Sequence, residues 1–207
     1  YEETIQAYFS GLEKFVAKGG DPSKVASVAS FFLSRIDTVI DEKIEEALDA
    51  TSNKTTREKL KSLLGKTAIA SAKMAYARYQ ELCGSERWKA LSDKGARPQR
   101  LLWASTSTKN PKYPATLYVD TLIGPETVNT IPAATFDAFR REGTAASTLT
   151  QNMEQAKNDL QTLAEVGISL KEATDFLLEE GVLKFADPFD KLLGSVEKKR
   201  QAFLEGG

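Results

Sequence analysis

The stretch that most constrains the fold runs from Val25 to Asp37 and reads VASVASFFLSRID. Small, β-branched and aromatic residues fill its first part, which is typical of a strand buried on both faces. The stretch turns polar at Ser34 and Arg35, and a helical pattern follows. A buried strand that feeds directly into a helix is the βα junction of an α/β protein. Such junctions often carry functional sites, because loops at the carboxyl ends of parallel strands converge over the sheet.

Side chains alternate along a strand, so this stretch has two different faces. The apolar face, suited to contact with helices, comprises Ala29, Phe31 and Leu33. The other face combines Phe32 with the hydroxyl groups of Ser30 and Ser34, which a hydrophobic core does not need. Arg35 follows at the predicted strand end, where a fixed cation could meet an anionic ligand. Serines bonded to the backbone and an arginine in a surface ion pair would explain the same residues.

Composition removes several classes of chemistry. The chain has 207 residues, a net charge of −1 and no histidine, and Cys83 is its single cysteine. These features exclude a Ser-His-Asp triad, a histidine-ligated zinc, a cysteine metal cluster and an intramolecular disulfide. A nearly neutral chain has no global attraction to nucleic acid or anionic lipid. No apolar run reaches the roughly 18 residues typical of a membrane span, so we expect a cytoplasmic protein.

A second predicted strand repeats the pattern of the first. Residues 100–106 read RLLWAST, and Ser105, Thr106 and Lys109 lie at the end of this strand. Hydroxyl groups with a nearby cation are suitable ligands for phosphate oxygens. A short third strand is predicted over residues 127–131. Two strands that each end on hydroxyls and a cation indicate an anion site more strongly than either strand alone.

Helical patterns surround these strands, and their charges, including Lys66 and Lys73, are expected on solvated outer faces. The end of the chain predicts three helices, with Gly181 ending the second of them. Their predicted ranges are Leu149–Val166, Ser169–Glu180 and Asp187–Leu204. The second begins with a capping box at Ser169–Glu172, and Pro188 lies in the first turn of the third. Three strands are too few to close a barrel, and a small parallel sheet leaves both edges open. Tyr1 already lies inside a helical pattern. We therefore expect the C-terminal half of a larger α/β domain.

Four motifs together resemble the transaldolase family, in particular its longer bacterial and plastid-type branch. They are VASFFLSRID at 28–37, ARPQRLLWAST at 96–106, KNP at 109–111 and TVNTIP at 127–132. The resemblance implies a (β/α)8 TIM barrel, of which the three strands here would be the sixth, seventh and eighth. It implies a half-barrel over residues 1–143 and a C-terminal helical extension over residues 144–207 that packs on the barrel.

The resemblance also implies a function. Transaldolases transfer a dihydroxyacetone unit between sugar phosphates in the pentose phosphate pathway, through a lysine Schiff base and without a metal or cofactor. Ser30 and Phe32 match active-site positions, Arg35 and Ser105 match phosphate-binding positions, and Lys109 stands near a further cationic position in a longer loop. The Schiff-base lysine would lie upstream of Tyr1, so the 207 residues alone are expected to be inactive.

The partners implied are ketose and aldose phosphates and the N-terminal half of the same barrel, in a monomer or homodimer, with no nucleic acid and no membrane. A plastid is the alternative location in a plant. Two other interpretations stay open from the residues themselves. One is a non-catalytic phosphate-binding α/β module, and the other is a helical interaction or scaffold protein whose strand ends are incidental.

Overall fold

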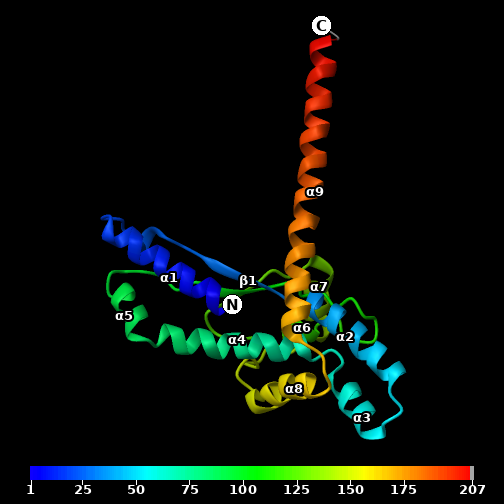
Figure 1. Cartoon of the computed structure of the whole chain (residues 1–207). Helices are drawn as coiled ribbons and strands as arrows, with labels where there is room; N and C mark the ends of the chain where they lie inside the picture. Colours follow the sequence, from blue (N-terminus) through cyan, green and yellow to red (C-terminus); the bar gives the residue numbers. More distant parts are fainter. Residues whose placement is uncertain (206–207) are drawn as a thin grey trace. The chain divides into compact units, whose positions relative to one another are not determined.

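The computed structural model describes residues 1–205, with the side chains of residues 185 and 205 left aside. The chain forms two compact units, of which the first is Tyr1–Ile168 and the second begins at Ser169. In the first unit a small sheet is accompanied by many helices (Figure 1). None of the described helices is both long and apolar enough to cross a membrane.

The sheet consists of three parallel strands in the order β1-β2-β3. The strands are β1 (Val28–Phe32), β2 (Arg100–Ala104) and β3 (Thr127–Asn129). Ser30 lies beside Leu102 and Phe32 beside Ala104, so the two strands end at the same level. The prediction of three parallel strands is confirmed. Within the described residues β1 and β3 each pair on one side only, as expected for an open sheet.

The two faces of the sheet differ in burial. On one face Ala29, Leu101 and Trp103 are buried, and the Trp103 indole donates a hydrogen bond of 3.1 Å to the Leu122 carbonyl. On the other face Ser30 and Phe32 are exposed. The prediction of a strand buried on both faces is therefore wrong for one face, because no described segment covers it.

The helices of the first unit precede, connect and follow the strands. Helix α2 starts directly after β1 and contacts both α3 and α4, and α8 packs along α4. The bounds are α1 (Glu2–Ala17), the short 3-10 turn η1 (Pro22–Lys24), α2 (Leu33–Ala50), α3 (Lys54–Leu63), α4 (Thr67–Cys83), α5 (Glu86–Ser92), α6 (Leu117–Thr121), α7 (Ala133–Glu142) and α8 (Met153–Glu165).

Helix α5 was missed by sequence reasoning. Gly84 and Gly95 bracket a segment that is too short for a clear helical period, and a single side-chain cap defines its start. The Ser85 Oγ accepts a 3.3 Å hydrogen bond from the Trp88 N–H, and Trp88 is buried.

The prediction that Lys73 lies on a solvated helix face is wrong, because this residue of α4 is only 6% exposed. Its ammonium group donates hydrogen bonds to the main-chain carbonyls of Thr148 and Gln151.

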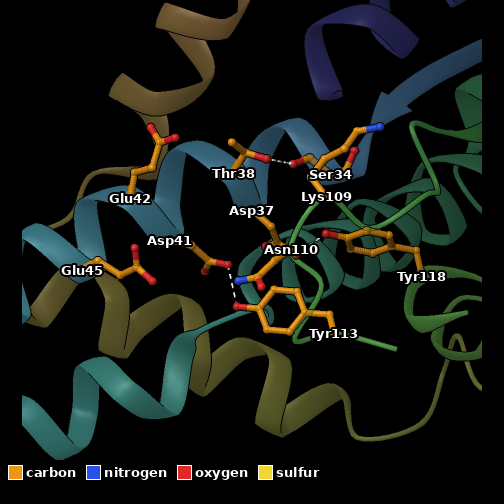
Figure 2. A pocket seen from close by; sticks show the side chains of 10 residues that line it. All are labelled: Ser34, Asp37, Thr38, Asp41, Glu42, Glu45, Lys109, Asn110, Tyr113 and Tyr118. Atoms are coloured by element: carbon orange, nitrogen blue, oxygen red, sulfur yellow. Dashed lines mark hydrogen bonds between the residues drawn. The ribbon is translucent and has the colours of Figure 1, made fainter. Parts of the chain in front are cut away.

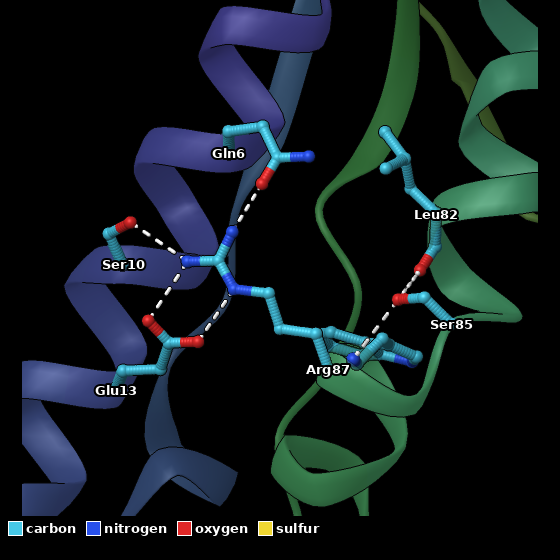
Figure 3. A network of polar contacts seen from close by, with 7 residues as sticks. Gln6, Ser10, Glu13, Leu82, Ser85 and Arg87 are labelled. Carbon is cyan, nitrogen blue, oxygen red and sulfur yellow. Dashed lines mark hydrogen bonds and ion pairs between the residues drawn. The ribbon is translucent and has the colours of Figure 1, made fainter.

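Arg87 connects α5 to α1. Its guanidinium group donates to the Glu13 carboxylate at 2.6 and 2.9 Å, to Ser10 Oγ at 2.9 Å, and to Gln6 Oε1 (Figure 3). All three partners lie on one side of α1. A planar guanidinium matches the two carboxylate oxygens, which makes this contact more specific than a single surface ion pair.

The second unit contains a single helix, α9, over Leu170–Glu205 (Figure 1). Ser169 caps its start as predicted, with its Oγ accepting a 3.2 Å bond from the Glu172 N–H. The predicted break at Gly181 is wrong, since the helix continues through both Gly181 and Pro188. A Cβ at Gly181 would meet no neighbour, and glycine lowers helix stability without forcing a helix to end. Pro188 removes one backbone donor, and the helix nevertheless continues past it.

The Arg87 contact leads to a stability prediction. Arg87→Ala should lower the free energy of unfolding by about 1 kcal/mol, because several charge-assisted hydrogen bonds between α1 and α5 are lost together. Urea unfolding followed by circular dichroism measures this change. Arg140→Ala is the control, because Arg140 makes one ion pair of 4.0 Å within α7. Equal effects of the two substitutions would contradict a specific role for Arg87.

Candidate functional site

The end of β1 and the start of α2 bring three of the predicted site residues together. Ser30 and Phe32 lie on the exposed face of β1. Arg35 lies in the first turn of α2 instead of at the strand end, because the helix begins at Leu33. Its guanidinium carbon is 4.8 Å from the centroid of the Phe32 ring. This cation–π contact holds the Arg35 side chain against the strand end.

The end of β2 is joined to the start of α2 by a backbone hydrogen bond. Ser105 has a φ of 54°, a left-handed conformation that is uncommon for residues other than glycine. Its carbonyl accepts a 3.1 Å bond from the Ser34 N–H. This bond places Ser105 next to the turn that carries Arg35. Unusual backbone conformations of this kind cluster at functional sites.

The third strand is joined to the second at the same end of the sheet. Thr106 is fully buried, and its Oγ1 donates a 3.0 Å hydrogen bond to the Thr130 carbonyl. The Thr130 N–H in turn donates a 3.0 Å bond to the Trp103 carbonyl. All three strands therefore end in one hydrogen-bonded layer.

Two cations at these strand ends lack an acidic partner. Within the described residues, no carboxylate lies at ion-pair distance from Arg35 or Lys109. The Lys109 ammonium donates a 3.1 Å hydrogen bond to the Ser107 hydroxyl. A cation without a carboxylate neighbour keeps its charge available for an anionic ligand.

A pocket of about 190 Å³ lies between α2 and the segment that follows β2. The lining residues are Ser34, Asp37, Thr38, Asp41, Glu42, Glu45, Lys109, Asn110, Tyr113 and Tyr118 (Figure 2). Figure 2 shows the Lys109 ammonium pointing toward the end of β1, away from the carboxylates of Glu42 and Glu45. The acidic side of the pocket does not suit a phosphate.

Two buried aspartates of α2 bind two tyrosines in this pocket. The Asp37 carboxylate accepts a 2.7 Å bond from the Tyr118 hydroxyl and another of 2.7 Å from the Ala68 N–H. One helical turn later, Asp41 accepts a 2.6 Å bond from the Tyr113 hydroxyl and one of 3.0 Å from the Gly65 N–H.

Burial decides the ionisation of these groups. Desolvation raises the pKa of Asp37 from 3.8 to about 6, against the opposing effect of its two hydrogen bonds. Burial also raises the pKa of Asp41. The pKa values of Tyr113 and Tyr118 are raised as well, first by desolvation and then by the neighbouring carboxylates, so both phenols are protonated donors.

Sequence reasoning did not single out these two pairs. The available signal was position, because Asp37 and Asp41 are four residues apart and lie next to the buried stripe of Ile36, Ile40 and Ile44. An acidic residue beside a buried helix stripe requires donors. Those donors come from residues 65–68 and 113–118, which the sequence alone does not place beside α2.

The arrangement defines an α/β protein with a parallel sheet, whose strand ends carry hydroxyls and unpaired cations on the side of an exposed sheet face. A family model described as transaldolase/fructose-6-phosphate aldolase matches residues 1–196. The chain belongs to this family.

Relatives in several bacteria share this similarity. The chain is 49% identical to a transaldolase of Trichodesmium erythraeum over 201 residues, which cover 96% of this chain and 53% of that protein. It is 47% identical to transaldolase 2 of a Nostoc species over 96% of this chain and 53% of the relative. A transaldolase of Frankia alni is 42% identical over 96% of this chain and 52% of the relative. The chain thus spans about half the length of these relatives.

The pKa of Asp37 predicts a pH dependence of stability. The folded chain binds a proton at Asp37 up to about pH 6, whereas an unfolded aspartate loses it near 3.8. Stability relative to Asp37→Asn should therefore fall as pH rises from about 4 to about 6, by about 3 kcal/mol in total, since each pH unit between the two pKa values contributes about 1.4 kcal/mol.

Urea unfolding of both proteins between pH 4 and pH 7.5 measures this difference. Asp41→Asn should show a trend of the same sign, because the pKa of Asp41 is also raised. A difference that grows with pH would mean that the hydrogen bonds from Tyr118 and Ala68 outweigh burial.

Proposed function

We propose that this chain forms the C-terminal half of a (β/α)8 barrel and that the whole protein is a transaldolase. In this proposal β1, β2 and β3 are the sixth, seventh and eighth strands, and α1 is the fifth helix. Residues 1–143 belong to the barrel, and residues 144–207 form a C-terminal helical extension. The observation that carries the proposal is the 49% identity with a transaldolase about twice as long as the matched segment.

The open sheet supports a half-barrel. Among the described residues, the three-stranded parallel sheet has two unpaired edges and one exposed face, which leaves backbone groups and apolar surface without partners. Further strands that pair with β1 and β3 would remove both edges and enclose the face that carries Ser30 and Phe32. Barrel enzymes have their active sites at the carboxyl ends of the strands, which is the end where Arg35 and Ser105 lie.

We propose that Arg35, Ser105 and Lys109 bind the phosphate group of a ketose or aldose phosphate. Arg35 offers a forked set of donors for two phosphate oxygens, and the Phe32 ring restricts its orientation. Ser105 contributes a hydroxyl, and Lys109 adds a second positive charge. Ser30 and Phe32 face the reacting part of the substrate.

The covalent step needs a lysine outside these 207 residues. In the proposed reaction a lysine amine attacks the ketose carbonyl, and loss of water gives an imine. Loss of the proton from the β-hydroxyl group breaks the bond between the α and β carbons, which releases an aldose phosphate and leaves the dihydroxyacetone unit on the lysine as an enamine. The enamine attacks the carbonyl carbon of an acceptor aldose phosphate, whose oxygen takes up a proton, and water hydrolyses the resulting imine to release the new ketose phosphate. The reacting lysine must be uncharged and lie in the barrel mouth.

A reacting lysine must be uncharged and must lie in the barrel mouth, and at least one of these conditions is not met by Lys24, Lys73 or Lys109. Lys24 belongs to η1 at the amino end of β1, and an ammonium bound to phosphate, as proposed for Lys109, stays protonated. Burial lowers the pKa of Lys73, but its ammonium donates to the Thr148 and Gln151 carbonyls at 2.8 and 2.6 Å, in the helical layer away from the strand ends.

Borohydride trapping tests the missing lysine. The 207-residue chain incubated with fructose 6-phosphate and then reduced should show no stoichiometric adduct by mass spectrometry. Addition of the part of the Trichodesmium erythraeum relative that this chain does not match should restore both the adduct and the turnover. A stoichiometric adduct on a lysine of this chain alone would overturn the assignment. Failure to restore turnover, with phosphate binding intact, would favour a non-catalytic phosphate-binding module.

Phosphate binding can be tested on the chain itself. Inorganic phosphate added at pH 7.5 should shift the NMR signals of residues 34–35 and 105–109 together, and a response at only one strand end would contradict a shared site. Arg35→Ala should weaken binding about ten- to hundredfold, because a charge-assisted contact worth about 1.5–3 kcal/mol is lost. Arg100→Ala is the matched control, because Arg100 lies at the opposite end of the same sheet.

A further inference from the structure

The segment between β2 and α6 carries Ser105 and Lys109, and both of its ends are attached to α2. At its start the Ser105 carbonyl accepts the Ser34 N–H at 3.1 Å. Toward its other end the Tyr113 hydroxyl donates to Asp41 at 2.6 Å, and in α6, which follows directly, the Tyr118 hydroxyl donates to Asp37 at 2.7 Å. Both carboxylates belong to the helix whose first turn carries Arg35.

The middle of this segment has only local hydrogen bonds among the described residues. Lys109 binds Ser107, the Lys112 N–H binds the Asn110 side chain at 3.0 Å, and the Tyr113 N–H binds the Asn110 carbonyl at 3.1 Å. Local bonds shape residues 107–112 but do not hold them against α2. The position of Lys109 relative to Arg35 therefore depends on the two ends of the segment.

We propose that Tyr113 and Tyr118 are positioning residues, which hold the Ser105–Lys109 segment at the distance from Arg35 that a phosphate group requires. This inference rests on the proposed phosphate site. Neither tyrosine contacts the ligand in this arrangement. Each acts through a carboxylate of α2, and the two pairs stand one helical turn apart, so together they fix the direction of the segment as well as its distance.

The carboxylates of Asp37 and Asp41 can fix the tyrosines because burial and backbone hydrogen bonds fix the carboxylates themselves. Asp37 is 2% exposed and Asp41 8% exposed. Each also accepts a backbone N–H, Asp37 from Ala68 in the first turn of α4 and Asp41 from Gly65 in the turn before α4. Gly65 has a φ of +69°, and a Cβ there would lie 2.7 Å from the Tyr113 ring, so the glycine lets Tyr113 approach Asp41. A buried carboxylate with fixed donors on one side presents its other oxygen in a single direction.

A purely structural role would predict a different behaviour. Tyr76 is also a buried tyrosine with one hydroxyl bond, to the Pro125 carbonyl at 3.1 Å, and it lies on α4 away from the segment. Tyr76→Phe is therefore the matched control for Tyr118→Phe. Tyr8→Phe, which removes a 2.8 Å bond to the Arg97 carbonyl, is the control for the less buried Tyr113.

The test uses the 207-residue chain and two readouts. Backbone ¹⁵N relaxation should show the order parameters of residues 107–112 falling from about 0.85 toward 0.6 in Tyr113→Phe and Tyr118→Phe, but not in the controls. The dissociation constant of inorganic phosphate at pH 7.5 should rise about two- to tenfold in the same two variants, because a smaller fraction of molecules has the segment in place.

Unchanged order parameters and affinity in Tyr113→Phe would overturn the proposal, and so would equal changes in the controls. If Tyr118→Phe does not fold, Tyr113→Phe decides the test, because the Tyr113 side chain is only half-buried. The relaxation readout does not require a bound ligand. If the wild-type chain binds no phosphate, the proposed phosphate site fails, and the order parameters still decide whether the tyrosines hold the segment.

Discussion

The hydrogen bond between the Ser34 N–H and the Ser105 carbonyl is the contact on which the arrangement of the site depends. It joins the first turn of α2 to the end of β2, in addition to the pairing of β1 with β2. Ser105 makes this bond from a left-handed backbone conformation, which turns the chain away from the regular strand direction. Such a conformation is unfavourable for a serine and persists only where the surroundings fix it. The fixed surroundings are the start of α2 and the buried Thr106–Thr130 bond.

Helix α2 separates two regions of opposite charge. Its first turn presents Arg35 toward Phe32 and the exposed face of the sheet. The following turns present Asp37 and Asp41 to tyrosines and to backbone N–H groups in and just before the first turn of α4. The carboxylates therefore do not neutralise Arg35, although they lie on the same helix. This separation keeps the positive charge of Arg35 on the side of the helix where we propose that a phosphate binds.

The exposed sheet face and the unpaired edges give the second constraint. A parallel sheet is stable when both of its faces are covered, and here one face has no cover within the described residues. The length of the relatives, about twice that of the matched segment, is consistent with a barrel whose other strands lie elsewhere in the longer proteins. The exposed Ser30 and Phe32 are then residues of an interior that this chain forms in part.

Much of the fold followed from sequence. The parallel strands, the capped start at Ser169 and the clustering of hydroxyls and cations at strand ends depend on local patterns, namely period, capping and turn residues. Local sequence patterns did not predict the helix boundaries correctly where hydrogen bonding and packing determine them. Gly181 suggested the end of one helix and Pro188 the first turn of the next, but a single helix continues through both. Helix α5 was too short for its period to be read, and Arg35 moved from strand to helix because boundaries depend on hydrogen bonds that no local pattern encodes.

By itself, the sequence determined the residue types at the strand ends and the family to which the chain belongs. Only the tertiary structure decided which distant residues meet. The donors to Asp37 and Asp41 come from residues 24 to 81 positions away, and Lys73 finds its acceptors 75 and 78 positions away. Such partners are chosen by how helices pack on the sheet. A buried charge must be paired, but the sequence does not say with what, because burial and partner arise together when the chain folds.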